Sequence, residues 1–182
     1  VAPLSVSAAD AVHPALSAFL GRLPVLGICY GAQLLSYSLG GRVEPVGTRE
    51  YGRASLNSID RNCRLFSGIK TPSQVWMSHG DSITALPDGY RPVASTDSVR
   101  LAAFEAVDAP VWGVQFHPEV MHTTEGFRLL ENFVVGICGS RCEWTPDSFV
   151  ESSVQELRAT LGDDKVVLGL SGGVDSSVAA VL

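Results

Sequence analysis

The sequence predicts an α/β protein, and three observations lead to this fold class. Short apolar runs bounded by glycine or turn residues, such as residues 23–28 and 166–170, are typical of buried strands. Apolar residues at helical spacing follow these runs, as in residues 31–39. The composition, 46% hydrophobic and 18% charged residues, fits a globular chain with a substantial core. Because strands and helices alternate, we expect an α/β arrangement in which helices flank a sheet.

The first 143 residues contain most of the predicted elements. The leucine spacing within residues 31–39 predicts a helix that ends at Gly40 and Gly41. An amphipathic helix is expected over residues 124–137, with a core side formed by Phe127, Leu130, Phe133 and Val134. The other predicted elements are a short helix at 14–20 and strands at 23–28, within 42–66, and at 75–77, 93–95, 101–105 and 111–116.

The rest of the chain repeats this alternation on a smaller scale. A turn and helix start at residues 144–147 leads into a helix over residues 150–161 that ends at Gly162. A buried strand at 166–170, a glycine-containing turn and a new helix follow. The one plausible boundary lies near residues 139–144, so we expect two domains, 1–143 and 144–182.

Composition and chain ends narrow the class of protein further. The formal net charge of −6 and the absence of a basic run argue against a nucleic-acid partner. No apolar run approaches the roughly 20 residues of a membrane span. The chain starts at Val1 and stops at Leu182 within an apolar helical pattern, so we expect an internal piece of a longer protein.

The four cysteines are expected to be free thiols rather than a disulfide framework. No signal-peptide pattern precedes them, which favours a cytoplasmic setting. Cys138 and Cys142 lie four residues apart, which is not a zinc-ribbon spacing, and no nearby histidine completes a site. We therefore expect no protein-bound zinc.

Cys29 lies between a predicted strand and a predicted helix, with Gly27 and Gly31 two residues to either side. This is the cysteine form of the nucleophile elbow, whose sharp turn needs glycines because neighbouring side chains are crowded. A helix N-terminus next to the sulfur is expected to favour the thiolate. The backbone N–H of Tyr30 is expected to point to the place where an oxyanion would form. The alternative is a small buried cysteine without a chemical role.

His117 ends a predicted strand, and Glu119 follows two residues later, across Pro118. In an extended chain these two side chains point the same way, so the carboxylate can orient the imidazole as a base. The other histidines have simpler interpretations: His13 lies in a loop, His122 in a polar turn, and His79 in a tight turn over residues 78–81 that offers backbone groups.

Three motifs, taken in order, resemble those of the class I, triad-type glutamine amidotransferases. They are Gly-Ile-Cys-Tyr-Gly-Ala-Gln, Met-Ser-His-Gly-Asp and Gly-Val-Gln-Phe-His-Pro-Glu, and the resemblance covers roughly residues 10–140. It implies that Cys29 attacks the glutamine carboxamide, forming a thioester and releasing ammonia, with His117 as base and acid and Glu119 as its orienter. It also implies that L-glutamine is held by Gln33, Ser78, His79, Gly80 and Asp81.

Part of that family pattern has no match in residues 1–24. The family places a Gly-Gly-Pro-type oxyanion loop and the first strands of the sheet before the cysteine strand. We therefore expect an amidotransferase sheet that lacks its N-terminal strands.

A second functional motif follows the predicted strand at 166–170. A glycine turn that leads into a helix presents backbone N–H groups to an anion, and the lack of Gly-Lys-Ser/Thr excludes a Walker A loop. The motif Ser-Gly-Gly-Val-Asp-Ser-Ser resembles the pyrophosphate loop of N-type ATP pyrophosphatases, which have an adenine nucleotide alpha hydrolase-like, Rossmann-like fold. The resemblance implies ATP, with Mg²⁺ near Asp175, bound by Ser171, Gly172, Gly173, Val174, Asp175, Ser176 and Ser177.

The order of the two motifs, with the loop about 50 residues after His-Pro-Glu, resembles the GMP synthetase family. The resemblance implies a cytoplasmic, homodimeric ligase of purine biosynthesis that uses glutamine, ATP and XMP. Two alternatives stay open. One is another synthetase that takes its ammonia from a class I amidotransferase, and the other is an inactive fragment.

Overall fold

The computed structural model describes residues 5–181, apart from the side chains of residues 46–50. The chain separates into two compact units, Val1–Ser140 and Arg141–Leu182. Each unit is described by itself.

A five-stranded sheet forms the centre of the first unit, in the order β1-β7-β6-β5-β3. Strand β1 (Val25–Ile28) pairs in parallel with β7 (Val111–Val114), and all other pairs are antiparallel. The strands predicted at 101–105 and 111–116 are confirmed as β6 (Ala103–Ala106) and β7, which pair antiparallel. The remaining strands are β5 (Tyr90–Ser95) and β3 (Ser58–Ile59).

Two long antiparallel strands, β2 (Arg42–Leu56) and β4 (Ser73–Ala85), form a second sheet. Strand β4 extends well beyond the predicted 75–77, and the tight turn expected at 78–81 is wrong. Pairing with β2 keeps this stretch extended, and a shift of register between Pro45 and Glu50 absorbs the irregularity opposite Gly80.

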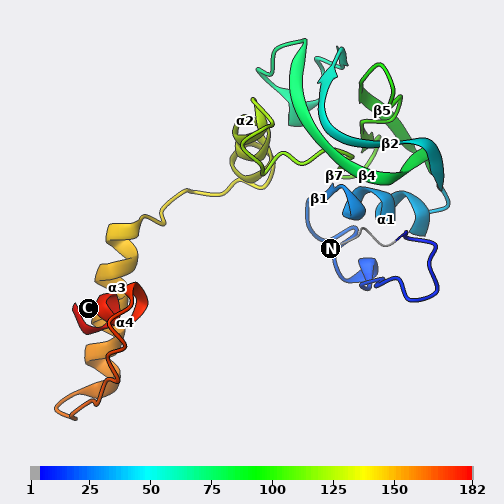
Figure 1. The fold of residues 1–182 in the computed structure, drawn as a ribbon. Coiled ribbons are helices and arrows are strands. Elements are labelled where there is room, and N and C mark those ends of the chain that lie inside the picture. Colours follow the sequence, from blue (N-terminus) through cyan, green and yellow to red (C-terminus); the bar gives the residue numbers. More distant parts are fainter. Residues whose placement is uncertain (1–4, 182) are drawn as a thin grey trace. The chain divides into compact units, whose positions relative to one another are not determined.

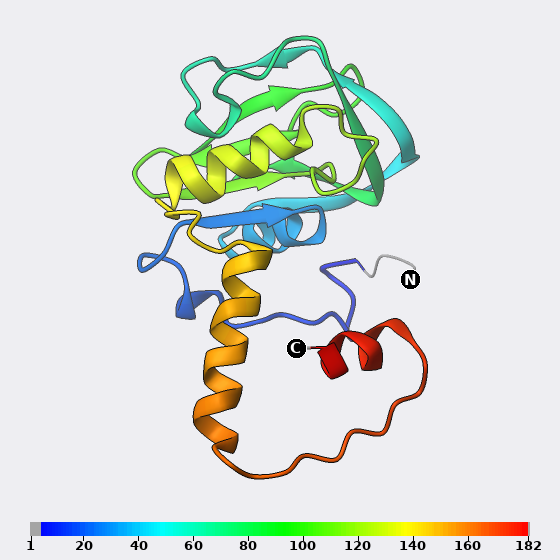
Figure 2. The same cartoon turned by 90° about the vertical axis from the view of Figure 1, so that its left-hand side faces the viewer.

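Helices cover both faces of the central sheet (Figures 1 and 2). Helix α1 (Tyr30–Ser38) packs Leu34 and Leu35 against Val111 and Phe104 on one face. On the other face, α2 (Gly126–Glu131) continues into a π-helix (Asn132–Ile137) and packs with Trp112. Short 3-10 helices occur at Leu16–Ala18 and Arg64–Phe66. Alternate residues of β7 thus contribute to two separate cores.

The predicted core side of the helix over 124–137 is right for Phe133 and wrong for Phe127 and Val134. Phe127 is 82% exposed and Val134 is 45% exposed, whereas Leu129 is buried and packs with Phe133 and Ile137. The core-facing residues Leu129, Phe133 and Ile137 lie four positions apart, and the second half of the segment is a π-helix, with the Cys138 N–H bonded to the Phe133 carbonyl. A π-helix turns more slowly than the α-helical period assumed from the sequence.

In the second unit, α3 (Pro146–Leu161) begins four residues before the predicted 150–161. Thr145 and Ser148 cap it through reciprocal side-chain to backbone bonds, and Gly162 ends it. The strand predicted at 166–170 is absent: the segment is irregular, and Val167 is 97% exposed. No strand among the described residues pairs with it, and an unpaired apolar run has no ladder to hold it extended. The predicted last helix is α4 (Val174–Val181).

Within residues 5–181, none of the helices combines the length and apolar character that crossing a membrane would require.

Candidate active site

Cys29 occupies the joint between β1 and α1. Its backbone has φ 49° and ψ −104°, a region that residues with a Cβ rarely adopt. The Cys29 N–H donates to the Val114 carbonyl at 2.8 Å, so the joint is tied to the carboxyl end of the neighbouring parallel strand β7. This strained strand-to-helix turn is the geometry that the sequence predicted for an elbow.

The two glycines of the elbow have different roles. A Cβ on Gly27 would lie 2.7 Å from the Gly31 carbonyl carbon and 2.8 Å from the Ala32 nitrogen. A Cβ on Gly31 would meet no heavy atom within 4 Å. The expectation that crowding requires both glycines is therefore right for Gly27 and wrong for Gly31, whose position on the first helical turn is open.

The Cys29 thiol is 8% exposed, and its charge state depends on competing effects. Burial raises the pKa of the Cys29 thiol more than the Tyr30 backbone N–H lowers it. The charge of Glu119 raises this pKa further, and a bond from Gln115 lowers it. The expectation that the helix N-terminus would favour thiolate is overridden by desolvation. Cys29 is therefore a thiol that needs a base.

His117 and Glu119 form a close pair after β7, with Nδ1 of His117 2.6 Å from Oε1 of Glu119. The segment is held on both sides. The His117 N–H donates to the Trp76 carbonyl at 2.9 Å, and the Thr123 hydroxyl donates to the His117 carbonyl at 2.6 Å. A Cβ on Gly126 would lie 2.0 Å from the Pro118 carbonyl oxygen, so only glycine lets α2 begin this close to the pair.

Strand β4 passes beside the elbow. The Cys29 thiol donates to the Ser78 carbonyl at 3.7 Å, and the Gln33 side chain donates to the Asp81 carbonyl at 2.7 Å. His79 is buried, with Nδ1 2.9 Å from the Asp81 carbonyl oxygen. The buried Oδ2 atom of Asp81 has no hydrogen-bond partner among residues 5–181, so it is an acceptor available to a bound cation or amine.

Two residues that sequence reasoning did not single out contact this site. Gln115 is 1% exposed and donates to the Cys29 sulfur at 3.9 Å. Thr123 braces His117 and also accepts the Trp76 N–H at 3.0 Å. Gln115 could have been noticed as the one amide inside the apolar run of β7 and its extension. No local pattern distinguishes Thr123, because Trp76, one of the two partners of its hydroxyl, is 47 positions away in the sequence.

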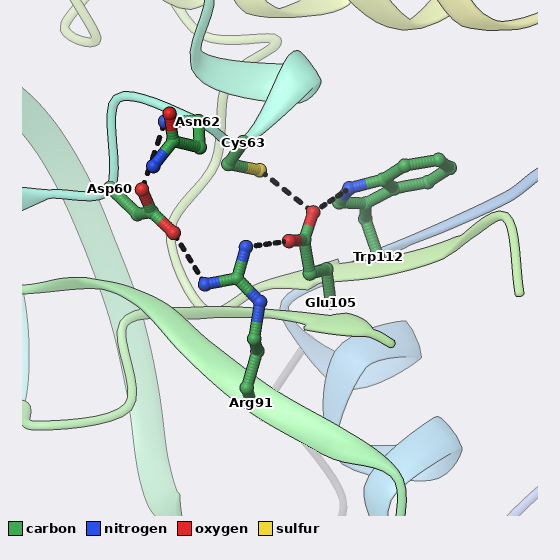
Figure 3. A network of polar contacts seen from close by, with 6 residues as sticks. All are labelled: Asp60, Asn62, Cys63, Arg91, Glu105 and Trp112. Atoms are coloured by element: carbon green, nitrogen blue, oxygen red, sulfur yellow. Dashed lines mark hydrogen bonds and ion pairs between the residues drawn. The ribbon is translucent and has the colours of Figure 1, made fainter. Parts of the chain in front are cut away.

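Cys63, the other buried cysteine, lies in a network of polar side chains (Figure 3). Its thiol donates to Glu105 at 3.1 Å, and the Trp112 indole N–H donates to the same carboxylate at 2.9 Å. Arg91 bridges Glu105 and Asp60. Burial, followed by the bond to Glu105, raises the pKa of Cys63 to about 12. Cys63 is therefore protonated at neutral pH and unsuited to nucleophilic attack.

The predicted phosphate loop is an exposed turn in the second unit. Gly172 has φ 81°, and the Ser171 hydroxyl lies 3.0 Å from the Ser176 hydroxyl and accepts the Gly173 N–H at 3.3 Å. The Ser177 hydroxyl donates to the Gly173 carbonyl at 2.8 Å. These bonds shape a turn in front of the N-terminus of α4, where Val174, Asp175, Ser176 and Ser177 form the first turn.

A metal site of protein ligands alone is not present in the part of the chain that is described. No group of three or more His, Cys, Asp or Glu side chains there could hold a metal ion. Asp175 is the one acidic residue within residues 171–177.

Comparison with known proteins decides the family. The family described as Glutamine amidotransferase class-I matches residues 2–137, which is most of the chain. The chain belongs to the class I glutamine amidotransferases. A second family, described as NAD synthase, matches residues 146–182 of the chain.

Relatives of this chain include glutamine-hydrolysing GMP synthases. That of Bacteroides thetaiotaomicron is 59% identical over 99% of this chain and 36% of its own length. That of Porphyromonas gingivalis strain W83 is 54% identical over 99% of this chain and 35% of its own length. A crystal structure from Thermoplasma acidophilum, of a protein proposed to be one subunit of a GMP synthase, has a TM-score of 0.60 and 32% identity over 73% of this chain and 61% of its own. The chain thus spans about a third of the curated relatives it matches.

Proposed function

We propose that this chain is part of a glutamine-hydrolysing GMP synthase, with a glutaminase domain over residues 1–143 and the start of an ATP-pyrophosphatase domain over 144–182. The observation that supports this most strongly is the strained elbow at Cys29, beside the end of the strand that leads to the His117–Glu119 pair. The GMP synthase names of the relatives indicate which molecule accepts the ammonia. The likeness of residues 171–177 to a pyrophosphate loop indicates that ATP is the second substrate.

In the proposed glutaminase step, His117 takes the Cys29 proton and the sulfur bonds to the carboxamide carbon of glutamine. The carbon–nitrogen bond then breaks, and the nitrogen leaves as ammonia with the proton that His117 returns. Water attacks the resulting thioester, which releases glutamate and restores the thiol. Glu119 holds Nδ1 of His117, which leaves Nε2 to exchange the proton.

The substrate contacts we propose lie around this centre. The Tyr30 N–H, which lowers the pKa of Cys29, would donate to the developing oxyanion. The unpartnered Oδ2 of Asp81 suits the α-amino group of glutamine, with Ser78, His79 and Gly80 forming the adjoining strand. Gln33 is buried and bonded to Asp81, so its part in binding glutamine is to hold that strand.

The second unit is proposed to bind ATP at residues 171–177. Backbone N–H groups at the turn and the N-terminus of α4 would hold the phosphates, and Asp175 would meet Mg²⁺ carried by ATP. ATP would adenylate XMP with release of pyrophosphate, and ammonia would displace AMP to give GMP. A homodimer and a cytoplasmic location remain predictions.

The acceptor is the part of this proposal that can be tested most simply. The full-length protein that contains this chain should convert XMP to GMP with glutamine and ATP, and should release pyrophosphate. Because residues 146–182 match the family described as NAD synthase, the second candidate is amidation of deamido-NAD. Product analysis with each acceptor separates the two: NAD formed in place of GMP would overturn the first assignment.

A further inference from the structure

A line of buried hydrogen bonds connects strand β4 to the nucleophile. The Gln33 amide nitrogen donates to the Asp81 carbonyl at 2.7 Å and to the Gln115 amide oxygen at 3.3 Å. The Gln115 amide nitrogen in turn donates to the Cys29 sulfur at 3.9 Å. Gln33 and Gln115 are 4% and 1% exposed, so water does not compete for these bonds.

The direction of this line is determined by one backbone group. The Asp81 carbonyl can only accept, so the nitrogen of Gln33 must face it. The same nitrogen also meets Gln115, which must therefore present its oxygen to Gln33. The Gln115 nitrogen is then the atom left for Cys29. A donor, rather than an acceptor, faces the sulfur as a consequence of the fold.

We propose that Gln115 is a catalytic residue that donates a hydrogen bond to the Cys29 sulfur and stabilises its thiolate, with Gln33 as the positioning residue that orients it. This inference rests on the proposed nucleophilic role of Cys29. The sulfur is a good acceptor only when it is ionised, so the bond strengthens as the proton moves to His117.

Other groups around the elbow also affect the charge of Cys29. The Tyr30 N–H lowers the pKa of the thiol and the charge of Glu119 raises it. Among the residues whose side chains are described, the titratable ones on the elements that pack against α1 are His79 and Asp81 on β4 and Arg42, Glu44, Tyr51 and Arg53 on β2, while His117 and Glu119 follow β7. The proposed effect must therefore be measured as a difference between variants in which all of these groups are retained.

The test is the pH dependence of Cys29 alkylation by iodoacetamide, followed by peptide mass spectrometry in the full-length protein. Gln115→Leu keeps the approximate volume and removes the donor, and should raise the pKa of Cys29 by about one unit, a roughly tenfold slower alkylation at neutral pH. Gln115→Glu keeps the shape and replaces the donor with a carboxylate, and should slow alkylation further. Gln33→Leu should shift the profile in the same direction by a smaller amount.

Two controls separate this effect from general loosening. Asn132→Leu removes an amide that donates to the Leu65 and Ser67 carbonyls on the other core, and should leave the Cys29 profile unchanged. Alkylation of the exposed Cys138 reports reagent access in each sample. Glutamine turnover by Gln115→Leu should show a lower kcat with little change in KM, because the bond acts on sulfur and not on substrate.

Unchanged alkylation profiles in Gln115→Leu and Gln115→Glu would overturn the inference. If one of the two variants does not fold, the profile of the other is sufficient for the test. This result is distinguishable from failure of the proposed function. If the alkylation profile shifts but Cys29 is not needed for glutamine hydrolysis, the hydrogen bond from Gln115 to Cys29 is supported and the nucleophilic role of Cys29 is contradicted.

Discussion

The imidazole of His117 and the carboxylate of Glu119 lie 2.6 Å apart, although only Pro118 separates the two residues in the chain. We expect Glu119→Gln to lower the glutaminase kcat with little change in KM, because an oriented imidazole matters most in the transition state. His117→Ala should cost about 10²–10⁴ in kcat, and Glu119→Gln should cost less. Steady-state kinetics of glutamine hydrolysis measure the kcat of both variants. An unchanged kcat in Glu119→Gln would show that Glu119 does not orient the catalytic imidazole.

The two elbow glycines should differ in their tolerance of alanine. In Gly27→Ala the new Cβ would lie 2.7 Å from backbone, so the helix must shift, at a cost of about 1–3 kcal/mol in the free energy of unfolding. Gly31→Ala places its Cβ in open space and should leave stability nearly unchanged. Denaturant unfolding of the pair measures the difference. Equal stabilities would show that the close approach at Gly27 is not a constraint.

Cys63 predicts a loss of stability at alkaline pH. Its pKa is raised from 9.0 to about 12 in the folded protein, so the unfolded chain loses this proton first. The stabilising effect of the buried thiol is full below about pH 9 and declines as the pH rises towards 12, by at most about 1.4 kcal/mol per pH unit.

The control for this prediction is Cys63→Ala, which lacks the titrating group. Other groups also titrate above pH 9, so the slope of unfolding free energy against pH must be compared between the two proteins. The variant should be less stable at pH 7, because Glu105 loses a donor, and should show a shallower alkaline slope. Parallel slopes would contradict the raised pKa.

Gly173 in the loop at residues 171–177 should be needed for binding of ATP rather than for folding. A Cβ on Gly173 would approach only the Ser171 hydroxyl, at 3.5 Å, so Gly173→Ala should fold normally. A branched side chain in Gly173→Val, placed where phosphate must approach backbone, should abolish ATP-dependent pyrophosphate release. Asp175→Ala should do the same by removing the Mg²⁺ contact. Normal pyrophosphate release by Gly173→Val and Asp175→Ala would contradict the ATP assignment.

Local signals in the sequence predicted the elbow and the histidine–glutamate pair, because each is made of neighbouring residues with a required backbone geometry. In the helix over 124–137 the sequence predicted the inward position of Phe133 but not that of Ile137, because the π-helical turn and the bonds from Asn132 to the distant Leu65 and Ser67 carbonyls leave no local signal. The strand expected at 166–170 was inferred from its apolar residues, but a strand also needs a partner, and none lies among the described residues.

The polar contacts of the site were the least predictable part. Gln115 and Gln33 meet across 82 positions of sequence, and Thr123 reaches Trp76 across 47. The charge state of Cys29 could not be predicted from the sequence either, because it depends on how deeply the thiol is buried. Burial and the helix N-terminus act in opposite directions on its pKa, and only the degree of burial in the fold decides which is larger.

The central claim is that Cys29 supplies ammonia to a separate amination reaction, and one measurement tests it directly. In the full-length protein, GMP formation from XMP and ATP should be assayed with glutamine and with added ammonium salt. We predict that Cys29→Ala loses the glutamine-dependent rate and keeps the ammonia-dependent rate, because only the glutaminase step uses the sulfur. Equal loss of both rates, or full retention of the glutamine-dependent rate, would contradict the claim.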